Sequence, residues 1–160
     1  MKRILILTFA FLFTFSTSIY ASESMISTVF NTDLSIENSQ KATTDVRPKF
    51  RIGFDAPQIN HRQLLLTIDE RATDAVDWGF DGEMSEVLED DMYWSLNDKK
   101  YVIQATNTLT LDKEIPLGVV MGDKGLATIQ IDALENVDES VELYIKDELL
   151  GTTTKINSDP

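Results

Sequence analysis

From residue 49 onward, the chain alternates apolar and polar residues in short runs separated by clusters of Gly, Pro, Asn and Asp. The first run, KFRIGF, places Phe50, Ile52 and Phe54 on one side, which is the two-residue period of a half-buried strand. We predict strands at residues 49–54, 61–69, 92–96, 101–106, 115–121, 126–132, 141–146 and 149–156. About seven or eight short strands, spaced roughly ten residues apart, predict an all-β fold with no long helix. The expected architecture is an antiparallel β-sandwich of the jelly-roll or immunoglobulin-like type.

Two local signals refine this arrangement. The tetrapeptide NDKK after residue 96 has the composition of a turn, so the strands on either side should form a β-hairpin. Tyr93, Trp94 and Tyr101 are then expected to pair across these strands. Pro116 has no backbone N–H, so residues 115–121 should form an edge strand or the start of one. Further residues expected to face the core are Leu64, Leu66, Ile68, Val141, Leu143 and Ile145.

The first 21 residues have the composition of a secretory signal peptide. Lys2 and Arg3 precede a largely apolar run at residues 4–15, and residues 16–21 are small and polar enough for cleavage after Ala21. The run is shorter than the roughly 18 residues of a transmembrane helix.

The predicted organisation has three parts. A signal peptide (residues 1–21) precedes a flexible leader rich in Ser, Thr, Asn and Asp (residues 22–47), in which residues 25–30 are an alternative short edge strand. Residues 48–160 form the β-domain. The protein is therefore expected to be exported to the periplasm, the cell surface or the medium, with no membrane insertion after signal cleavage.

The charge and the cysteine content exclude several functions. The chain has 14 basic and 27 acidic residues, and loss of Lys2 and Arg3 with the signal peptide changes the net charge from −13 to −15. Such a surface repels the phosphates of nucleic acid and of anionic lipid, so neither is an expected partner. The chain has no cysteine, which excludes disulfides and thiolate chemistry, and the domain must be held by its apolar core.

Residues 72–83, ATDAVDWGFDGE, combine acids, glycines and large aromatics without a helical or strand period. We interpret them as a structured loop, in which Gly79 and Gly82 allow special backbone conformations and Trp78 and Phe80 hold the loop against the core. Residues 69–91 contain ten acids and a single base, so this segment is expected to border water or a cation.

Calcium is the candidate cofactor of this loop, because four carboxylates on a glycine-containing segment offer the hard oxygen ligands that calcium prefers. The candidate ligands are Asp74, Asp77, Asp81 and Glu83. Their spacing is not that of an EF-hand, and the alternative is that these acids cap turns, accept backbone hydrogen bonds or face water. A second hypothesis makes Trp78, Phe80 and Trp94 a platform for stacking sugars, and its alternative places these rings in the core.

The chain shows no catalytic constellation. The single histidine, His61, begins a predicted strand, and no G-x-S-x-G segment is present, so a structural or solvent-exposed role is expected for it. A zinc site would lack His and Cys ligands. Pairs of carboxylates could be nominated for a glycosidase, but 27 acids single out no particular pair. We therefore predict that the protein is not an enzyme.

A resemblance to a known family runs through six segments: HRQLLLTIDERATDAVDWGFDGE, DMYW, KKYVIQA, IPLGV, ATIQIDALENVD and VELYIKDELLGTTTKI. In this order they resemble the β-sandwich domain found near the C-termini of large surface and secreted proteins of gliding bacteria that use type IX secretion. The resemblance spans about residues 49–156. Its most specific part is the loop, through Ala72, Thr73, Asp74, Asp77, Gly79, Phe80 and Asp81.

The resemblance implies a non-catalytic exported module with a structural or adhesion-associated role. Its partner would be a surface polysaccharide or another cell-surface protein. The alternative function is that of a calcium-dependent carbohydrate-binding module. Members of the family continue with a closing strand of the form G-x-(Y/F)-x-(D/N)-R-F and a sorting domain, which do not follow here. We therefore expect the β-domain at residues 48–160 to lack its last strand.

Overall fold

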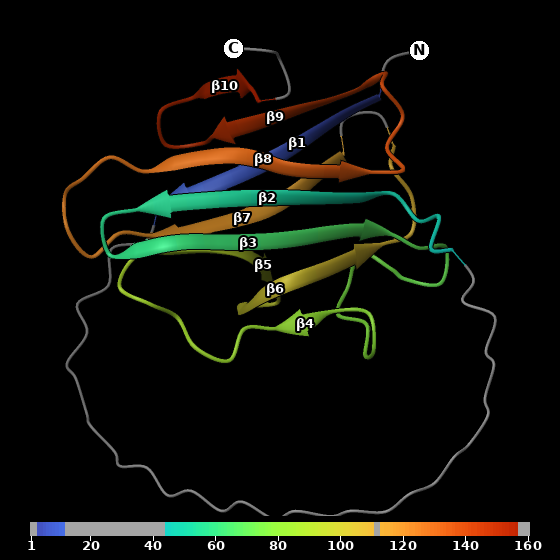
Figure 1. The fold of residues 1–160 in the computed structure, drawn as a ribbon, viewed down its shortest axis with the longest axis horizontal. Coiled ribbons are helices and arrows are strands. Elements are labelled where there is room, and N and C mark those ends of the chain that lie inside the picture. Colours follow the sequence, from blue (N-terminus) through green and yellow to red (C-terminus); the bar gives the residue numbers. More distant parts are fainter. Residues whose placement is uncertain (1–2, 12–43, 111–112, 157–160) are drawn as a thin grey trace, which may run out of the picture. The chain divides into compact units, whose positions relative to one another are not determined.

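The computed structural model describes residues 3–11, 44–110 and 113–156 (Figure 1). These residues form ten strands and no helix, which confirms the all-β prediction. The strands are β1 (Arg3–Phe11), β2 (Lys49–Ala56), β3 (Ile59–Ile68), β4 (Gly82–Glu83), β5 (Asp91–Leu96), β6 (Lys99–Thr106), β7 (Lys113–Val120), β8 (Thr128–Glu135), β9 (Val141–Asp147) and β10 (Thr152–Lys155). One curled, mixed sheet contains them in the order β10-β9-β1-β7-β5-β6-β3-β2-β8, and β4 pairs with β6 outside this path. No helix in the described ranges could cross a membrane.

The alternating pattern correctly predicts which side chains form the core. All eight predicted strands occur, as β2, β3 and β5 to β10. In β2, Phe50, Ile52 and Phe54 are at most 1% exposed, and in β3, Leu64 and Leu66 are fully buried. These side chains pack into one apolar cluster, whose other members include Trp94, Ile115, Leu117, Val119, Val141 and Leu143, with Ile68 and Ile145 partly buried against it.

Strand β5 connects the two halves of the sheet. Asp91 to Trp94 pair with β7, whereas Trp94 to Leu96 pair with β6, so the strand changes its partner at Trp94. This change lets the sheet curl around the apolar cluster. Trp94 is fully buried at this point, and its indole Nε1–H donates a hydrogen bond to the backbone oxygen of Leu65 at 3.0 Å.

Strands β5 and β6 form the predicted hairpin. Trp94 and Tyr101 face each other across it, as expected for an aromatic cross-strand pair. The turn itself is only Asn97 and Asp98, which have φ angles of 48° and 62°. Asn and Asp tolerate this left-handed region better than most residues, so a two-residue turn is sufficient and Lys99 already belongs to β6.

The prediction that all pairings are antiparallel is wrong in three places. Strand β3 pairs with β6 in parallel, and β1 is parallel to both β7 and β9. Figure 1 shows the arrows of β3 and β6 pointing the same way. Parallel neighbours require a long connection. The segment between β3 and β6 contains the acidic loop, β4 and β5, which return the chain before β6 begins.

Strand β1 consists of residues that the sequence assigns to the signal peptide. It lies between β7 and β9, so β7 is not an edge strand in the full chain. On the β5 side Pro116 leaves no ladder hydrogen bond unmade, because β7 pairs with β5 only through the four residues after it, 117–120; on the other side it is in register with Thr8 of β1. The predicted cleavage position after Ala21, the alternative strand at 25–30 and the leader up to residue 43 lie outside the described residues.

Candidate functional site

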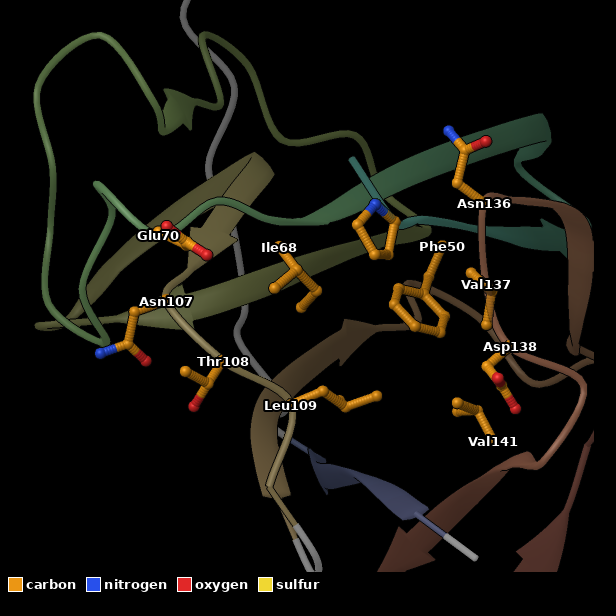
Figure 2. A pocket seen from close by; sticks show the side chains of 11 residues that line it. Phe50, Ile68, Glu70, Asn107, Thr108, Leu109, Asn136, Val137, Asp138 and Val141 are labelled. Atoms are coloured by element: carbon orange, nitrogen blue, oxygen red, sulfur yellow. The ribbon is translucent and has the colours of Figure 1, made fainter. Parts of the chain in front are cut away.

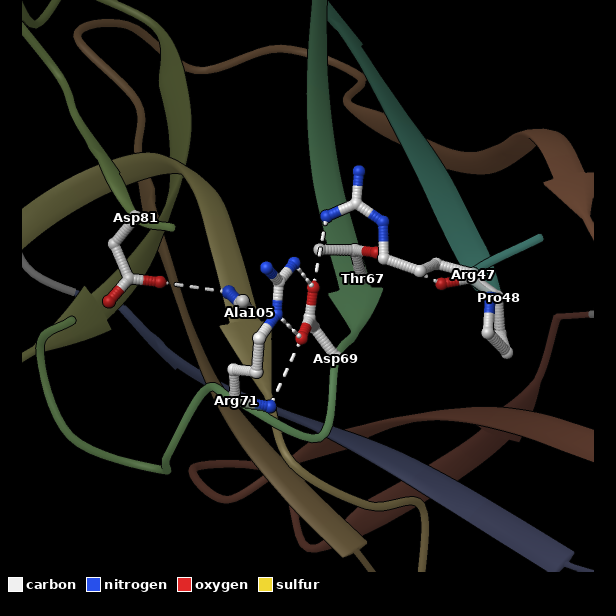
Figure 3. A network of polar contacts seen from close by, with 7 residues as sticks. All are labelled: Arg47, Pro48, Thr67, Asp69, Arg71, Asp81 and Ala105. Atoms are coloured by element: carbon white, nitrogen blue, oxygen red, sulfur yellow. Dashed lines mark hydrogen bonds and ion pairs between the residues drawn. The ribbon is translucent and has the colours of Figure 1, made fainter. Parts of the chain in front are cut away.

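The acidic loop begins at Asp69, which anchors it to the end of β3 (Figure 3). The Asp69 carboxylate is almost completely buried and accepts hydrogen bonds from the Arg71 Nε (2.9 Å), Nη2 (2.8 Å) and backbone N (3.0 Å), and from the Arg47 Nη1 (3.2 Å). The hydrogen bonds from Arg71 hold the pKa of this carboxyl well below its usual range. The carboxylate therefore fixes the start of the loop to the segment before β2.

Two further carboxylates fasten the loop to itself and to the sheet. Asp81 accepts a hydrogen bond from the backbone N of Ala105 in β6 at 2.8 Å (Figure 3), and its other oxygen accepts one from the backbone N of Asp77 at 2.6 Å. Asp77 in turn accepts hydrogen bonds from the backbone N and the hydroxyl of Thr73. These contacts belong to the turn-capping alternative for the acids.

The other two predicted calcium ligands point to different partners. Asp74 accepts hydrogen bonds from the hydroxyl of Thr106 and from the Lys113 ammonium. The bond from Lys113 has the larger effect, and both lower the pKa of Asp74. Glu83 accepts a hydrogen bond from Lys99 at 2.9 Å on the surface. Within the described ranges, no group of three or more His, Cys, Asp or Glu side chains could hold a metal ion. The structure thus brings Asp77 and Asp81 together without Asp74 and Glu83, and the calcium site remains a prediction from the sequence.

The aromatic residues of the loop do not behave as predicted. Trp78 is 98% exposed, whereas Trp94 is completely buried, so the two rings cannot form a sugar-stacking platform. Phe80 is partly buried, and the Arg71 guanidinium lies 5.2 Å from its ring centroid. Gly79 has a φ of 85°, the left-handed conformation that glycine adopts readily, directly after Trp78. Carboxylate hydrogen bonds, and not burial of Trp78, hold the loop.

Two adjacent acids at the end of the acidic segment are fully buried, which the sequence did not predict. Asp91 makes a bidentate ion pair with Arg62 of β3 (2.7 and 2.8 Å) and accepts the backbone N–H groups of Leu88 and Met92 at 2.9 Å each. The pair raises the pKa of Arg62. Because these partners satisfy the carboxylate, the expectation that all acids of 69–91 border water is wrong for Asp91, and also for Asp69.

Asp90 connects two loops. It accepts backbone hydrogen bonds from Gln58, in the β2–β3 turn, and from Gly122, after β7, both at 2.8 Å. It is also fully buried. A sequence signal for this pair of acids existed: they stand directly before the apolar run that begins at Met92, where a charge can be buried only with dedicated partners.

His61 lies on the outer face of β2, β3 and β8. Its Nδ1 is 2.9 Å from a carboxylate oxygen of Asp55, and its Nε2 is 2.9 Å from one of Asp132. Both hydrogen bonds raise the pKa of the imidazole, and the bond to Asp55 has the larger effect. Gly53 leaves room for the arrangement, because a Cβ there would overlap Asp132 and His61. With both ring nitrogens engaged by carboxylates, His61 links three strands.

A pocket of about 380 Å³ opens at the end of the sheet where the acidic loop starts (Figure 2). Figure 2 shows apolar side chains, among them Phe50, Ile68 and Leu109, pointing into it, with polar groups such as Glu70 and Asn107 at its margin. This chemistry suits a small apolar group.

Comparison with known proteins places the chain in a family. Residues 12–160 match the family described as Domain of unknown function (DUF8693), so the chain belongs to this family. No curated protein and no solved structure matches it. The family description assigns no activity, and the resemblance to the type IX-associated domain therefore remains a prediction.

Proposed function

We propose that the protein is an exported, non-catalytic β-sandwich module with a structural or adhesion-associated role, and that it contacts its partner through the loop at residues 72–83. The sandwich is supported by β5, which pairs with β7 through one half and with β6 through the other, so two groups of strands pack around one core. A signal peptide composition at residues 1–21 supports export.

The observation that carries the proposal is the exposure of Trp78. This side chain is 98% exposed, although Trp is among the most apolar residues and usually buries most of its surface. Its loop is held by the hydrogen bonds of Asp69, Asp77 and Asp81. A large aromatic on a fixed loop loses little conformational entropy when it binds, and Trp is enriched among the residues that dominate protein interfaces.

The charge of the chain limits the class of partner. The predicted mature protein has a net charge of −15, which opposes binding to nucleic acid or to anionic membrane. A surface polysaccharide, which can stack on an indole ring, or another cell-surface protein fits better.

The test is the variant Trp78→Ala of the mature protein, residues 22–160. Binding would be measured on a panel of immobilised polysaccharides and on outer-surface preparations of the source cells. We expect an unchanged thermal midpoint, because the ring is not part of the core, and a loss of binding of at least tenfold. The matched control is Leu126→Ala, since Leu126 is also apolar and 84% exposed but lies outside the loop. Equal binding by Trp78→Ala and the wild type would refute the proposal.

A further inference from the structure

Strand β1 fills a slot one strand wide between β7 and β9. Residues 5–11 pair with 113–119 of β7, and residues 3–9 pair with 141–147 of β9, in parallel on both sides. Signal cleavage after Ala21 would remove β1. Because neighbouring strands lie about 4.8 Å apart, β7 and β9 would then be separated by roughly 10 Å, too far for direct hydrogen bonds.

The strands on both sides of the slot contribute to the apolar core. Ile115, Leu117 and Val119 of β7 and Val141 and Leu143 of β9 are at most 4% exposed when β1 is in place. An empty slot would expose part of this surface to water, together with two rows of unpaired backbone N–H and C=O groups. The exported protein therefore needs an occupant.

The outer side of the slot restricts the occupant further. The Lys146 Nζ of β9 lies 3.1 Å from the Glu114 Oε1 of β7, so this ion pair spans the slot. Glu114 is in register with Ile6 of β1, and Lys146 is in register with Thr8. A charged residue at either position of the occupant would disturb the pair. The register positions of Leu5, Leu7 and Phe9 adjoin Leu143, Ile115 and Leu117, so they require apolar residues.

The leader, residues 22–47, contains no segment that meets these requirements. In the leader, residues 25–30 carry their apolar side chains in adjacent pairs and not at alternate positions, and residues 30–36 alternate but place Asp33 at a central outward position. The apolar strands of a second copy already pair within its own sheet.

We propose that the slot between β7 and β9 binds an apolar β-strand of about seven residues from a second, different protein, in parallel to both neighbours. The proposal rests on the proposed export, because only signal cleavage vacates the slot. Two backbone ladders would supply affinity, and the alternation of apolar with uncharged residues would supply specificity, as in other complexes formed by strand addition.

The experiment uses residues 22–160 and a synthetic peptide, RILILTFAF with solubilising lysines at both ends, as the probe. We expect one peptide to bind per chain, to raise the thermal midpoint by about 5 °C or more, and to slow amide hydrogen exchange in residues 113–120 and 141–147. Exchange in β2, residues 49–56, serves as the internal control. Peptides with Leu7→Pro or Ile6→Asp should bind at least tenfold more weakly, because the first breaks the ladder and the second places a negative charge beside Glu114.

Three results would overturn the proposal. The peptide fails to slow exchange in β7 and β9; or these strands are already protected in a monomer, which means that the chain closes the slot itself; or they are protected only in a dimer, which makes a second copy the occupant. Export is judged separately by the mass of the protein recovered outside the inner membrane. Retention of residues 3–11 there would refute signal cleavage, and absence of the protein from that fraction would refute the proposed export. Failure of the peptide to bind residues 22–160 would refute strand binding alone.

Discussion

Replacement of Asp91 by Ala tests whether the buried acids stabilise the fold. The substitution removes a fully buried carboxylate and leaves the guanidinium of Arg62, whose side chain is 24% exposed, without its bidentate partner. It also deprives the backbone N–H groups of Leu88 and Met92 of an acceptor. No other carboxylate of the acidic segment is bonded to a side chain of β3 in this bidentate manner within the described residues.

The expected loss of unfolding free energy follows from these contacts. Each hydrogen bond to a charged group contributes about 1.5–3 kcal/mol, but four bonds to one carboxylate are not additive. Breaking a buried ion pair by removing one partner costs about 3–5 kcal/mol, and we take this as the expected loss for Asp91→Ala. A domain of this size is stable by about 5–15 kcal/mol, so the variant should lose a large part of its stability.

Urea unfolding followed by circular dichroism at pH 7 measures this loss. The control is Glu83→Ala, which breaks the exposed pair with Lys99 and should leave the urea midpoint unchanged. The double variant Arg62→Met with Asp91→Ala should lose less than the sum of the two single variants, because the unpaired guanidinium is gone. A loss below about 1 kcal/mol for Asp91→Ala would refute the reasoning, since it would mean that the buried pair contributes no more than an exposed one.

Two further predictions concern His61 on the outer face of the sheet and the close approach of Gly118 to the Tyr93 ring. The pKa of His61 is raised, so its bonds to Asp55 and Asp132 stabilise the fold fully below about pH 6.5, and this stabilisation is lost as the pH rises through the folded-state pKa. The stability difference between wild type and His61→Gln, measured in urea titrations, should therefore shrink from pH 5.5 to pH 9. A difference that grows over this range would contradict the prediction. Gly118→Ala should lower stability by about 1–3 kcal/mol, because the new Cβ would overlap the Tyr93 ring, and an unchanged thermal midpoint would show that the ring can move aside.

The strands and the core could be predicted because they depend on a local pattern. Alternation in the sequence identifies Phe50, Ile52 and Phe54 as inward residues, whichever strands become neighbours. The parallel pairing of β3 with β6 is different, because it depends on the path of the whole connection between them, and no local period records that path. Strand β1 was missed because an apolar run at a basic N-terminus has the composition of an export signal, whatever it pairs with.

The sequence identified the residues of the candidate site but not the interactions that hold them in place. The loop at residues 72–83 and its acids were identified, whereas the ring expected to hold the loop, Trp78, faces solvent. The general preference of acids for water failed at Asp90 and Asp91, because Arg62 and four backbone N–H groups satisfy them. Some of these partners are far away in the sequence and others are backbone N–H groups, so the amino-acid composition of the segment does not reveal them.

The opposite environments of the two tryptophans give the protein two built-in optical reporters. Trp78, at 98% exposure, should emit at long wavelength and be quenched readily by iodide or acrylamide, whereas buried Trp94 should emit at shorter wavelength and resist quenching until the sheet opens. Since the chain contains only these two tryptophans, changes at the loop and changes in the core can be followed in the same sample without a label. A partner that covers the loop would remove the quenchable fraction of the emission, and unfolding would restore it for both rings.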